Sequence, residues 1–304
     1  MRILVTGGNS MVAKHIKELY PKAIYSSSKE YNLISLNHAQ ALVNIYQPDV
    51  VVHTAAKVGS MIDNMTYKYD YMIDNMMINM NIIKACQRAN VKKLIAVSST
   101  CAYPDVLPED MYPMKEESIH LGSPTETSIG YAYSKRMLQL AIDLCNEQNG
   151  TEYNYIIPCN IYSEYDGHQG DRMHYMTRLL YKLGTSKAEE QEIYMEGSGE
   201  TSRQYIYGGD LAKIIQLHIK NNINESYNIG SENLKLSEWS DKTIRALGLV
   251  MDKRVIFKNS IPAGQVRKDV SSEKFYSIYP DFEFSDFDET INKVYDKQYV
   301  NQIS

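Results

Sequence analysis

Residues 1–16 read MRILVTGGNSMVAKHI, a short apolar run that ends in glycines and continues into a helical pattern. In a dinucleotide-binding turn, glycines permit a tight bend and a close approach of the backbone to a pyrophosphate, whose charge the start of the next helix binds. Gly7 and Gly8 supply the bend, while Ser10 and Ala13 stand where further glycines are usual. Because both side chains are small, we expect the stretch to retain a dinucleotide site after the first strand.

The alternation of strand and helix continues down the chain. Strand patterns lie at 2–6, 23–26, 50–54, 93–98 and 153–158, with helical patterns at 11–20, 36–45, 71–89 and 130–150. Apolar strands that alternate with longer helices are typical of βαβ units on a parallel sheet. The sequence therefore predicts an α/β fold of Rossmann type, with a doubly wound parallel sheet.

The pattern becomes less regular after about residue 160. Loop-like stretches occur at 163–172 (SEYDGHQGDR) and 197–204 (GSGETSRQ). We expect residues 1–160 to form the dinucleotide-binding domain, with segments after residue 200 returning to it. Residues 161–304 are expected to form most of a smaller substrate-binding domain.

Composition limits the partners and the location. The chain has 304 residues, 43% of them hydrophobic, and a formal charge of −5, which offers no electrostatic footprint for nucleic acid or an anionic membrane. Its first residues read directly as a strand pattern, so we expect no targeting segment, and no apolar run reaches the roughly 18 residues that a membrane span needs. The cysteines lack the spacing of a zinc site or a redox pair; they are Cys86, Cys101, Cys145 and Cys159. We therefore expect reduced thiols, no metal and a cytoplasmic protein.

A candidate catalytic group begins at the end of the fourth predicted strand. Residues 129–138 read IGYAYSKRML and place Tyr131 and Lys135 four residues apart, on one face of a helix. An ammonium beside a phenol lowers the pKa of the phenol, so Tyr131 is expected to donate a proton to a carbonyl that is being reduced. Ser99, at the carboxyl edge of the sheet, is placed to hydrogen-bond the same carbonyl.

The end of the second strand bears on which dinucleotide binds. An acidic residue there commonly holds the ribose 2′-hydroxyl of NAD. Residues 24–29 instead read IYSSSK, and Glu30 follows them. These residues favour NADP(H), with Ser26 to Ser28 and Lys29 near the 2′-phosphate.

Taken together, the strand with a serine-rich end and the Tyr-x-x-x-Lys pattern about thirty residues on resemble the extended short-chain dehydrogenase/reductase superfamily. Within it, the order of motifs resembles the GDP-L-fucose synthase family, which epimerises C3 and C5 of a nucleotide sugar and reduces C4. The motifs span nearly the whole chain: AAKVGSMIDN (55–64), NMMINMNIIKACQRANVKKL (75–94), SSTCAYP (98–104), GYAYSK (130–135), PCNIY (158–162), GSGETSRQYIYGGDLA (197–212), YNIGSENLKLSEW (227–239) and GQVRK (264–268).

This resemblance implies catalytic roles. Ser99, Tyr131 and Lys135 would form the reductive triad, in which Tyr131 protonates the C4 oxygen while hydride reaches C4, and Lys135 also contacts the nicotinamide ribose. Cys101 and His174 match the family's epimerisation pair, which removes and returns the protons that a C4 ketone acidifies at C3 and C5. Dehydratases of the superfamily carry an Asp-Glu pair where this chain has Thr100 and Cys101, which counts against dehydration.

The resemblance also implies binding residues. Asn160, Arg203 and Lys268 match substrate-binding positions, and the two cations correspond to contacts with the nucleotide diphosphate. The cofactor-binding positions are Gly7, Gly8, Asn9, Ser10, Met11, Val12, Ser28, Lys29, Asn32, Leu33, Ala55, Ala56, Lys57, Pro158, Asn160 and Ile161. The implied cofactor is NADPH, with NADH as the alternative, and the implied partner is a GDP-sugar. Superfamily members commonly dimerise by pairing two helices per subunit, so a homodimer through 71–89 and 131–148 is expected.

Several departures from the family bear on ligand choice. Asn9 and Ser28 replace two arginines that the family places around the 2′-phosphate of NADP. Glu196 replaces a tryptophan before GSG, while Cys159 and Ser163 replace a threonine and a glycine. These changes touch the nucleotide-sugar pocket and leave the sugar open.

The leading hypothesis is NADPH-dependent reduction of the C4 ketone of a GDP-linked 4-keto sugar, either a 6-deoxyhexose or a heptose, with or without 3,5-epimerisation. One alternative is a nucleotide-sugar 4-epimerase that retains bound NAD, and another is a 4-reductase without epimerase activity. A non-catalytic dinucleotide-binding regulator of the same fold is disfavoured because Ser99, Tyr131 and Lys135 are all present.

Overall fold

The computed structural model describes residues 1–167, 173–187, 189–221, 223–249, 253–258 and 264–300. Residues 168–172 of the expected loop SEYDGHQGDR therefore lie outside the described residues.

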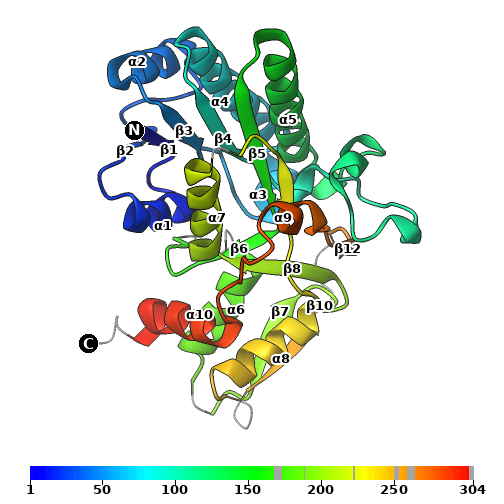
Figure 1. Ribbon diagram of the computed structural model, residues 1–304. Coiled ribbons are helices and arrows are strands. Elements are labelled where there is room, and N and C mark those ends of the chain that lie inside the picture. The colour runs from blue at the N-terminus through cyan, green and yellow to red at the C-terminus, as the bar shows by residue number, and fades with distance from the viewer. Residues whose placement is uncertain (168–172, 188, 222, 250–252, 259–263, 301–304) are drawn as a thin grey trace.

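A six-stranded parallel sheet forms the centre of the molecule (Figure 1). Its strand order is β2-β1-β3-β4-β5-β9, and every neighbouring pair is parallel. The strands are β1 (Ile3–Thr6), β2 (Ile24–Ser26), β3 (Val50–His53), β4 (Lys93–Val97), β5 (Glu152–Pro158) and β9 (Tyr227–Ile229). The chain turns from β1 to β2 on one side and on to β3 on the other, which opens a crevice at the carboxyl ends of β1 and β3.

Helices cover both faces of this sheet, so successive side chains of one strand enter different cores. Ile3 and Val5 pack with α1 and α7, whereas Leu4 packs with α2, α4 and α5. These helices are α1 (Met11–Leu19), α2 (Leu36–Tyr46), α4 (Lys68–Arg88), α5 (Ile129–Asn149) and α7 (Gly208–Lys220). Burial on both faces explains the near-continuous apolar runs of the strands. The predicted Rossmann-type fold is confirmed.

Short helical elements occupy two connections that the sequence patterns left without structure. They are α3 (Met61–Thr66) after β3, and η1 (Thr100–Ala102), η2 (Glu109–Met111), η3 (Glu116–His120) and η4 (Glu126–Ser128) between β4 and α5.

A second group of elements lies below the main sheet in Figure 1 and builds its own core around Trp239 and Tyr207. Its strands are β6 (Asn160–Tyr162), β7 (Glu192–Glu196), β8 (Ser202–Tyr207), β10 (Asn233–Lys235), β11 (Arg254–Lys258) and β12 (Arg267–Lys268). Its helices are α6 (Tyr175–Thr185), α8 (Leu236–Ala246) and α10 (Phe287–Tyr295), which η6 (Asp296–Val300) extends; α9 (Glu273–Ile278) contacts β9 instead. Strand β8 is the centre of this part, since β6, β10 and β12 all pair with it.

None of the described helices combines the length and the apolar character that a membrane crossing would need.

Candidate active site

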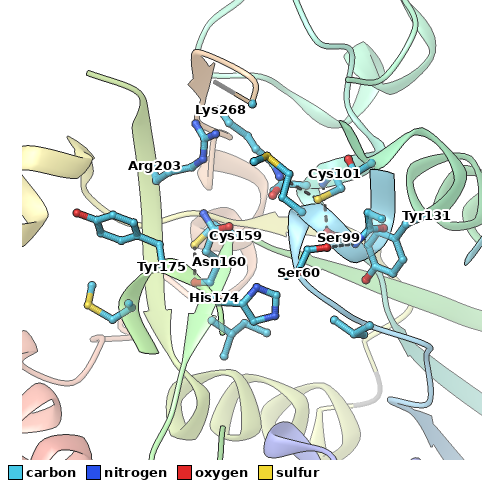
Figure 2. A pocket seen from close by; sticks show the side chains of 18 of the residues that line it. Ser60, Ser99, Cys101, Tyr131, Cys159, Asn160, His174, Tyr175, Arg203 and Lys268 are labelled. Atoms are coloured by element: carbon cyan, nitrogen blue, oxygen red, sulfur yellow. Dashed lines mark hydrogen bonds between the residues drawn. The ribbon is translucent and has the colours of Figure 1, made fainter. Parts of the chain in front are cut away.

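A cavity of about 650 Å³ lies at the carboxyl edge of the main sheet. Segments that follow β1, β3, β4 and β5 form part of its wall, together with the start of α5, and residues of β7, β8, β12 and the start of α6 also line it. Figure 2 shows side chains from both parts of the chain directed into it. All five residues expected to be catalytic line this cavity: Ser99, Cys101, Tyr131, Lys135 and His174. The three expected substrate-binding residues, Asn160, Arg203 and Lys268, line it too.

The turn after β1 requires its two glycines. Gly7 has a φ of +68°, and a Cβ there would lie 2.7 Å from the Cα of Ala55. A Cβ on Gly8 would lie 2.8 Å from the Cβ of Tyr25. Since neighbouring residues block both positions, the turn has the close approach that a dinucleotide-binding turn needs.

Ser10 and Ala13 preserve this turn where glycines are usual. Ser10 caps α1, because its Oγ accepts a hydrogen bond from the Ala13 N–H at 3.2 Å and lies 2.9 Å from Thr54 Oγ1. Ala13 is fully buried against the sheet. Met11 and Val12 line the cavity at the start of α1, where first-turn N–H groups have no intrahelical acceptor and suit a pyrophosphate. The residues present therefore fit a dinucleotide.

The other expected cofactor positions divide into two sets. Ala56, Pro158, Asn160 and Ile161 line the cavity with Ser10, Met11 and Val12. Those that do not line it are Gly7, Gly8, Asn9, Ser28, Lys29, Asn32, Leu33, Ala55 and Lys57. The Leu33 side chain is buried in the core, and Lys57 forms an ion pair with Asp74 at 2.6 Å, so neither side chain is directed to a ligand here.

Glu30 lies in the turn after β2 and hydrogen-bonds within it. Its carboxylate accepts hydrogen bonds from the backbone N–H of Ser27 at 3.2 Å and from the Ser27 hydroxyl at 3.0 Å. An acidic group therefore lies at the end of β2 even though the first residues after the strand are serines.

Helix α5 brings the reductive triad together. Lys135 Nζ donates a hydrogen bond to the Val97 carbonyl oxygen at 2.7 Å and lies 5.7 Å from the centre of the Tyr131 ring. Ser99 caps η1 and its Oγ accepts from the Cys101 N–H at 3.1 Å. The four-residue spacing thus places Tyr131 and Lys135 on one face, beside the end of β4.

Two more side chains of α5 hold the segment that carries Ser99 and Cys101. The Arg136 guanidinium donates to the carbonyl oxygen of Ala102, and Gln139 Nε2 donates to Ser98 Oγ at 2.7 Å. Both side chains are buried, so the helix and the turn after β4 form one rigid unit.

The expected lowering of the Tyr131 pKa is wrong for this structure. Burial raises the pKa of the phenol, the charge of Cys101 adds to the rise, and a hydrogen bond with Ser99 offsets part of it. Burial also lowers the pKa of Lys135 to about 8, against a smaller opposite effect of Cys101. Because the lysine is directed at a carbonyl oxygen rather than at the phenol, burial is the main influence on the pKa of Tyr131. A phenol that keeps its proton at neutral pH is still suited to donate it.

Cys101 forms a close contact that its sequence position does not reveal. Its Sγ accepts a hydrogen bond from Lys268 Nζ at 3.0 Å. Burial alone would raise the pKa of the thiol, but Lys268, Ser99 and Arg203 together bring that pKa below its usual value. Cys159, also in the wall, shows the ordinary behaviour, because burial raises its pKa to about 12.

Arg203 and Lys268 are direct register partners on the parallel strands β8 and β12. Register partners project from the same face of a sheet, and Figure 2 shows both side chains above the cavity. Two adjacent cations of this kind can hold a diphosphate. His174 occupies the N-cap position of α6 and enters the cavity from a different element (Figure 2).

Other cavity residues were missed by the sequence reasoning. Arg178 lies one helical turn after His174 and pairs with Glu196 at 3.5 Å, so the residue that replaces the family's tryptophan has an ionic partner. A helical pattern starting at His174 would have revealed Arg178. Ser60 at the N-cap of α3 and Gln265 before β12 also line the cavity, but no local pattern indicated them.

One group of three potential metal ligands occurs among the described residues. Ligand atoms of His15, Glu18 and Glu164 lie within 4.8 Å of one another. Glu164, however, pairs with Lys293 at 2.9 Å and accepts a hydrogen bond from Tyr207, and an ammonium on the same carboxylate opposes a metal cation. The group serves as a polar link between α1 and α10, and the absence of a metal stays a prediction.

Comparison with known proteins agrees with the fold. Residues 3–230 match the NAD dependent epimerase/dehydratase family. The chain is 30% identical to a GDP-L-fucose synthase of Dictyostelium discoideum over 96% of its length and 93% of the relative. It is 27% identical to a GDP-L-colitose synthase of Yersinia pseudotuberculosis, over 88% of each chain. The crystal structure of a GDP-L-fucose synthetase from Naegleria fowleri bound to NADP superimposes with a TM-score of 0.85 at 26% identity, covering 99% of this chain and 93% of that one. The chain belongs to the NAD dependent epimerase/dehydratase family.

Proposed function

We propose that the protein uses NADPH to reduce the C4 ketone of a GDP-linked 4-keto sugar, and that it epimerises C3 and C5 in the same cavity. The observation that carries the proposal is the meeting of two groups in one cavity: the proton-donating set of Ser99, Tyr131 and Lys135, and the Cys101 thiol paired with Lys268. The relatives named for GDP-L-fucose and GDP-L-colitose synthesis support a GDP-sugar.

In the reductive step, bound NADPH supplies hydride to C4. Gly7, Gly8 and the start of α1 hold its pyrophosphate. Tyr131 donates its phenolic proton to the C4 oxygen, and the Ser99 hydroxyl hydrogen-bonds the same oxygen. The Lys135 ammonium supports the phenolate that remains on Tyr131.

In the epimerisation steps, the C4 ketone acidifies the protons on C3 and C5. The Cys101 thiolate removes a proton and leaves an enolate, whose negative charge the ketone oxygen carries. A protonated His174 then gives its proton to the opposite face of the same carbon, which inverts it. Proton exchange with solvent returns Cys101 to the thiolate and His174 to its protonated form before the second carbon reacts. A thiolate and an imidazole on different elements can reach opposite faces of one ring.

Arg203 is proposed to hold the nucleotide diphosphate, and Asn160 to contact the substrate. Residues 1–160 would then hold mainly the dinucleotide and residues 161–304 mainly the sugar nucleotide. Strand β9 and helix α7 are exceptions, since both pack on the main sheet. The sugar is proposed to be a 6-deoxyhexose, with a heptose as the second class to test.

A homodimer is proposed through α4 and α5. Both helices carry large exposed apolar side chains one turn apart, Ile73 and Met77 on α4 and Leu140 and Leu144 on α5. Apolar side chains so spaced suit a helix-to-helix interface. Light scattering on the protein as it elutes from a size-exclusion column measures its molar mass and so tests this proposal. The Leu140→Glu variant is expected to be a monomer. A cytoplasmic location is also proposed, and the free cysteines support it.

The activity is tested by following NADPH oxidation with GDP-4-keto-6-deoxymannose, with a GDP-4-keto-heptose as a second substrate. Oxidation that needs the ketone supports the proposal. If the purified protein instead carries tightly bound NAD and interconverts C4 epimers without added reductant, the 4-epimerase alternative is correct.

A further inference from the structure

Lys268 contacts a thiol rather than a carboxylate. Its Nζ lies 3.0 Å from Cys101 Sγ. Within the part of the chain that the structure describes, no carboxylate forms an ion pair with Lys268. The most direct electrostatic partner of this buried ammonium is therefore the sulfur atom, although Lys268 was expected to bind a diphosphate.

The arrangement of β12 explains this choice. Arg267 and Lys268 are consecutive on the strand, so they project from opposite faces. Arg267 binds both oxygens of the neighbouring Asp269, at 2.8 and 3.1 Å, and lies over the Tyr112 ring. This bidentate pair occupies the carboxylate of the residue that follows Lys268 in the chain. Lys268 projects from the other face of the strand, where it contacts Cys101.

The other charged groups near Cys101 have different contacts. Arg203, the register partner of Lys268, donates to the backbone oxygen of Ser202 at 2.7 Å. Lys135 donates to the Val97 carbonyl oxygen, and Tyr131 is a neutral phenol. Of the three cations, Lys268 is therefore the one that hydrogen-bonds the sulfur, and Arg203 remains beside it for the diphosphate.

We propose that Lys268 is a positioning residue that keeps Cys101 as a thiolate before substrate binds, while Arg203 makes the main contact with the diphosphate. An ammonium within hydrogen-bond distance stabilises a thiolate over a thiol. The place of this thiolate in epimerisation rests on the proposed function. The ion pair itself depends only on the geometry of β12 and η1.

The test is the pH dependence of Cys101 alkylation by iodoacetamide, read on the Cys101 peptide by mass spectrometry. The variants are Lys268→Met, Lys268→Arg and, as a matched control, Lys274→Met. Lys274 is a partly exposed lysine that pairs with Glu225 and does not line the cavity, so its loss changes net charge equally without touching the cavity. Cys101→Ser identifies the peptide signal.

In the wild-type protein, alkylation is expected to reach half its maximal rate below pH 8.5, about the pKa of an ordinary cysteine. Lys268→Met is expected to move this midpoint upward and to slow alkylation at pH 7 by about tenfold or more. Lys268→Arg and Lys274→Met are expected to keep the wild-type midpoint. A loss of packing alone would speed alkylation at every pH and leave the midpoint unchanged.

Coincident profiles for Lys268→Met and the wild type would overturn the proposal. So would a wild-type midpoint at or above about pH 8.5, a result that needs no variant to fold. The alkylation uses neither sugar nor NADPH. A protein that fails to oxidise NADPH with the ketone but shows the Lys268-dependent midpoint would refute the proposed function and support the ion pair.

Discussion

Lys135 Nζ donates a hydrogen bond to the carbonyl oxygen of Val97 at 2.7 Å, and so joins the helix that carries Tyr131 to the end of β4, two residues before Ser99. The two residues are 38 positions apart in the sequence. Buried hydrogen bonds from Arg136 and Gln139 strengthen the same junction. The triad is therefore held by a rigid contact between two secondary-structure elements, and small changes at Tyr131 should alter chemistry without altering the fold.

Tyr131→Phe is expected to lower kcat for ketone reduction by about 10²- to 10⁴-fold, because it removes the proton donor. NADPH binding should be unchanged, since the turn after β1 is untouched. The rate of NADPH oxidation at saturating ketone gives kcat, and fluorescence titration measures NADPH affinity. Retention of more than about a tenth of the wild-type kcat would contradict the assigned role.

The rate of reduction is expected to fall at alkaline pH. Burial lowers the pKa of Lys135 to about 8, so the ammonium is charged below this pH and is lost as pH rises through it. The phenol of Tyr131 keeps its proton over the same range, because its pKa is raised. We expect kcat/KM for reduction to decline above about pH 8 in the wild type. A kcat/KM that is flat to about pH 10 would show that the charge on Lys135 is not required.

Gly7→Ala is expected to weaken NADPH binding and to lower the free energy of unfolding by about 2 kcal/mol or more. Its Cβ would meet the Ala55 backbone at 2.7 Å, in addition to the strain of a φ of +68°. Gly150→Ala is the matched control: it has a φ of +64°, but no atom lies within 4 Å of the place its Cβ would take. It should carry only the conformational cost, about 1 kcal/mol, and bind NADPH normally. If the two variants lost equal unfolding free energy and equal NADPH affinity, the clash with Ala55 would not be the cause.

Ser28→Arg is expected to raise kcat/KM for NADPH by about tenfold, with little change for NADH. Ser28 lies in the exposed turn after β2, where the family places an arginine near the 2′-phosphate. Glu30 already lies in this turn, where its carboxylate would repel a 2′-phosphate, so the wild type is expected to discriminate weakly between the cofactors. Side-by-side kinetics with NADPH and NADH test this. An unchanged NADPH to NADH ratio would place the 2′-phosphate elsewhere.

The sequence predicted the first five strands of the main sheet closely, for a physical reason, whereas the three-residue strand β9 lay beyond the regular pattern. Strands such as Val50–His53 are buried on both faces, so their apolar runs are continuous and their ends are marked by polar residues. Tyr131 and Lys135 were also predictable, because helical spacing alone decides that they share a face. Contacts that depend on the register of a short strand were not predictable from the sequence. Lys268 reaches Cys101 from 167 positions away, through the register of the two-residue strand β12, and no local pattern specifies that register.

The pKa of Tyr131 was mispredicted for a related reason. Spacing shows that Lys135 is near the phenol, but not that its Nζ is bonded to Val97 or that the phenol is buried. Helix α3 and the turns η1 to η4 escaped prediction because they are too short for a periodic apolar pattern. The domain division and the individual roles of the site residues stay predictions.

The most direct test of the account is a reaction of the protein with NADPH and GDP-4-keto-6-deoxymannose in heavy water, with the product analysed by mass spectrometry. The account predicts consumption of one NADPH per sugar and solvent deuterium at both C3 and C5. Cys101→Ser should lose this deuterium. Reduction without solvent deuterium would contradict the epimerisation, and an absence of NADPH consumption with this ketone and with the heptose ketone would contradict the reductase assignment itself.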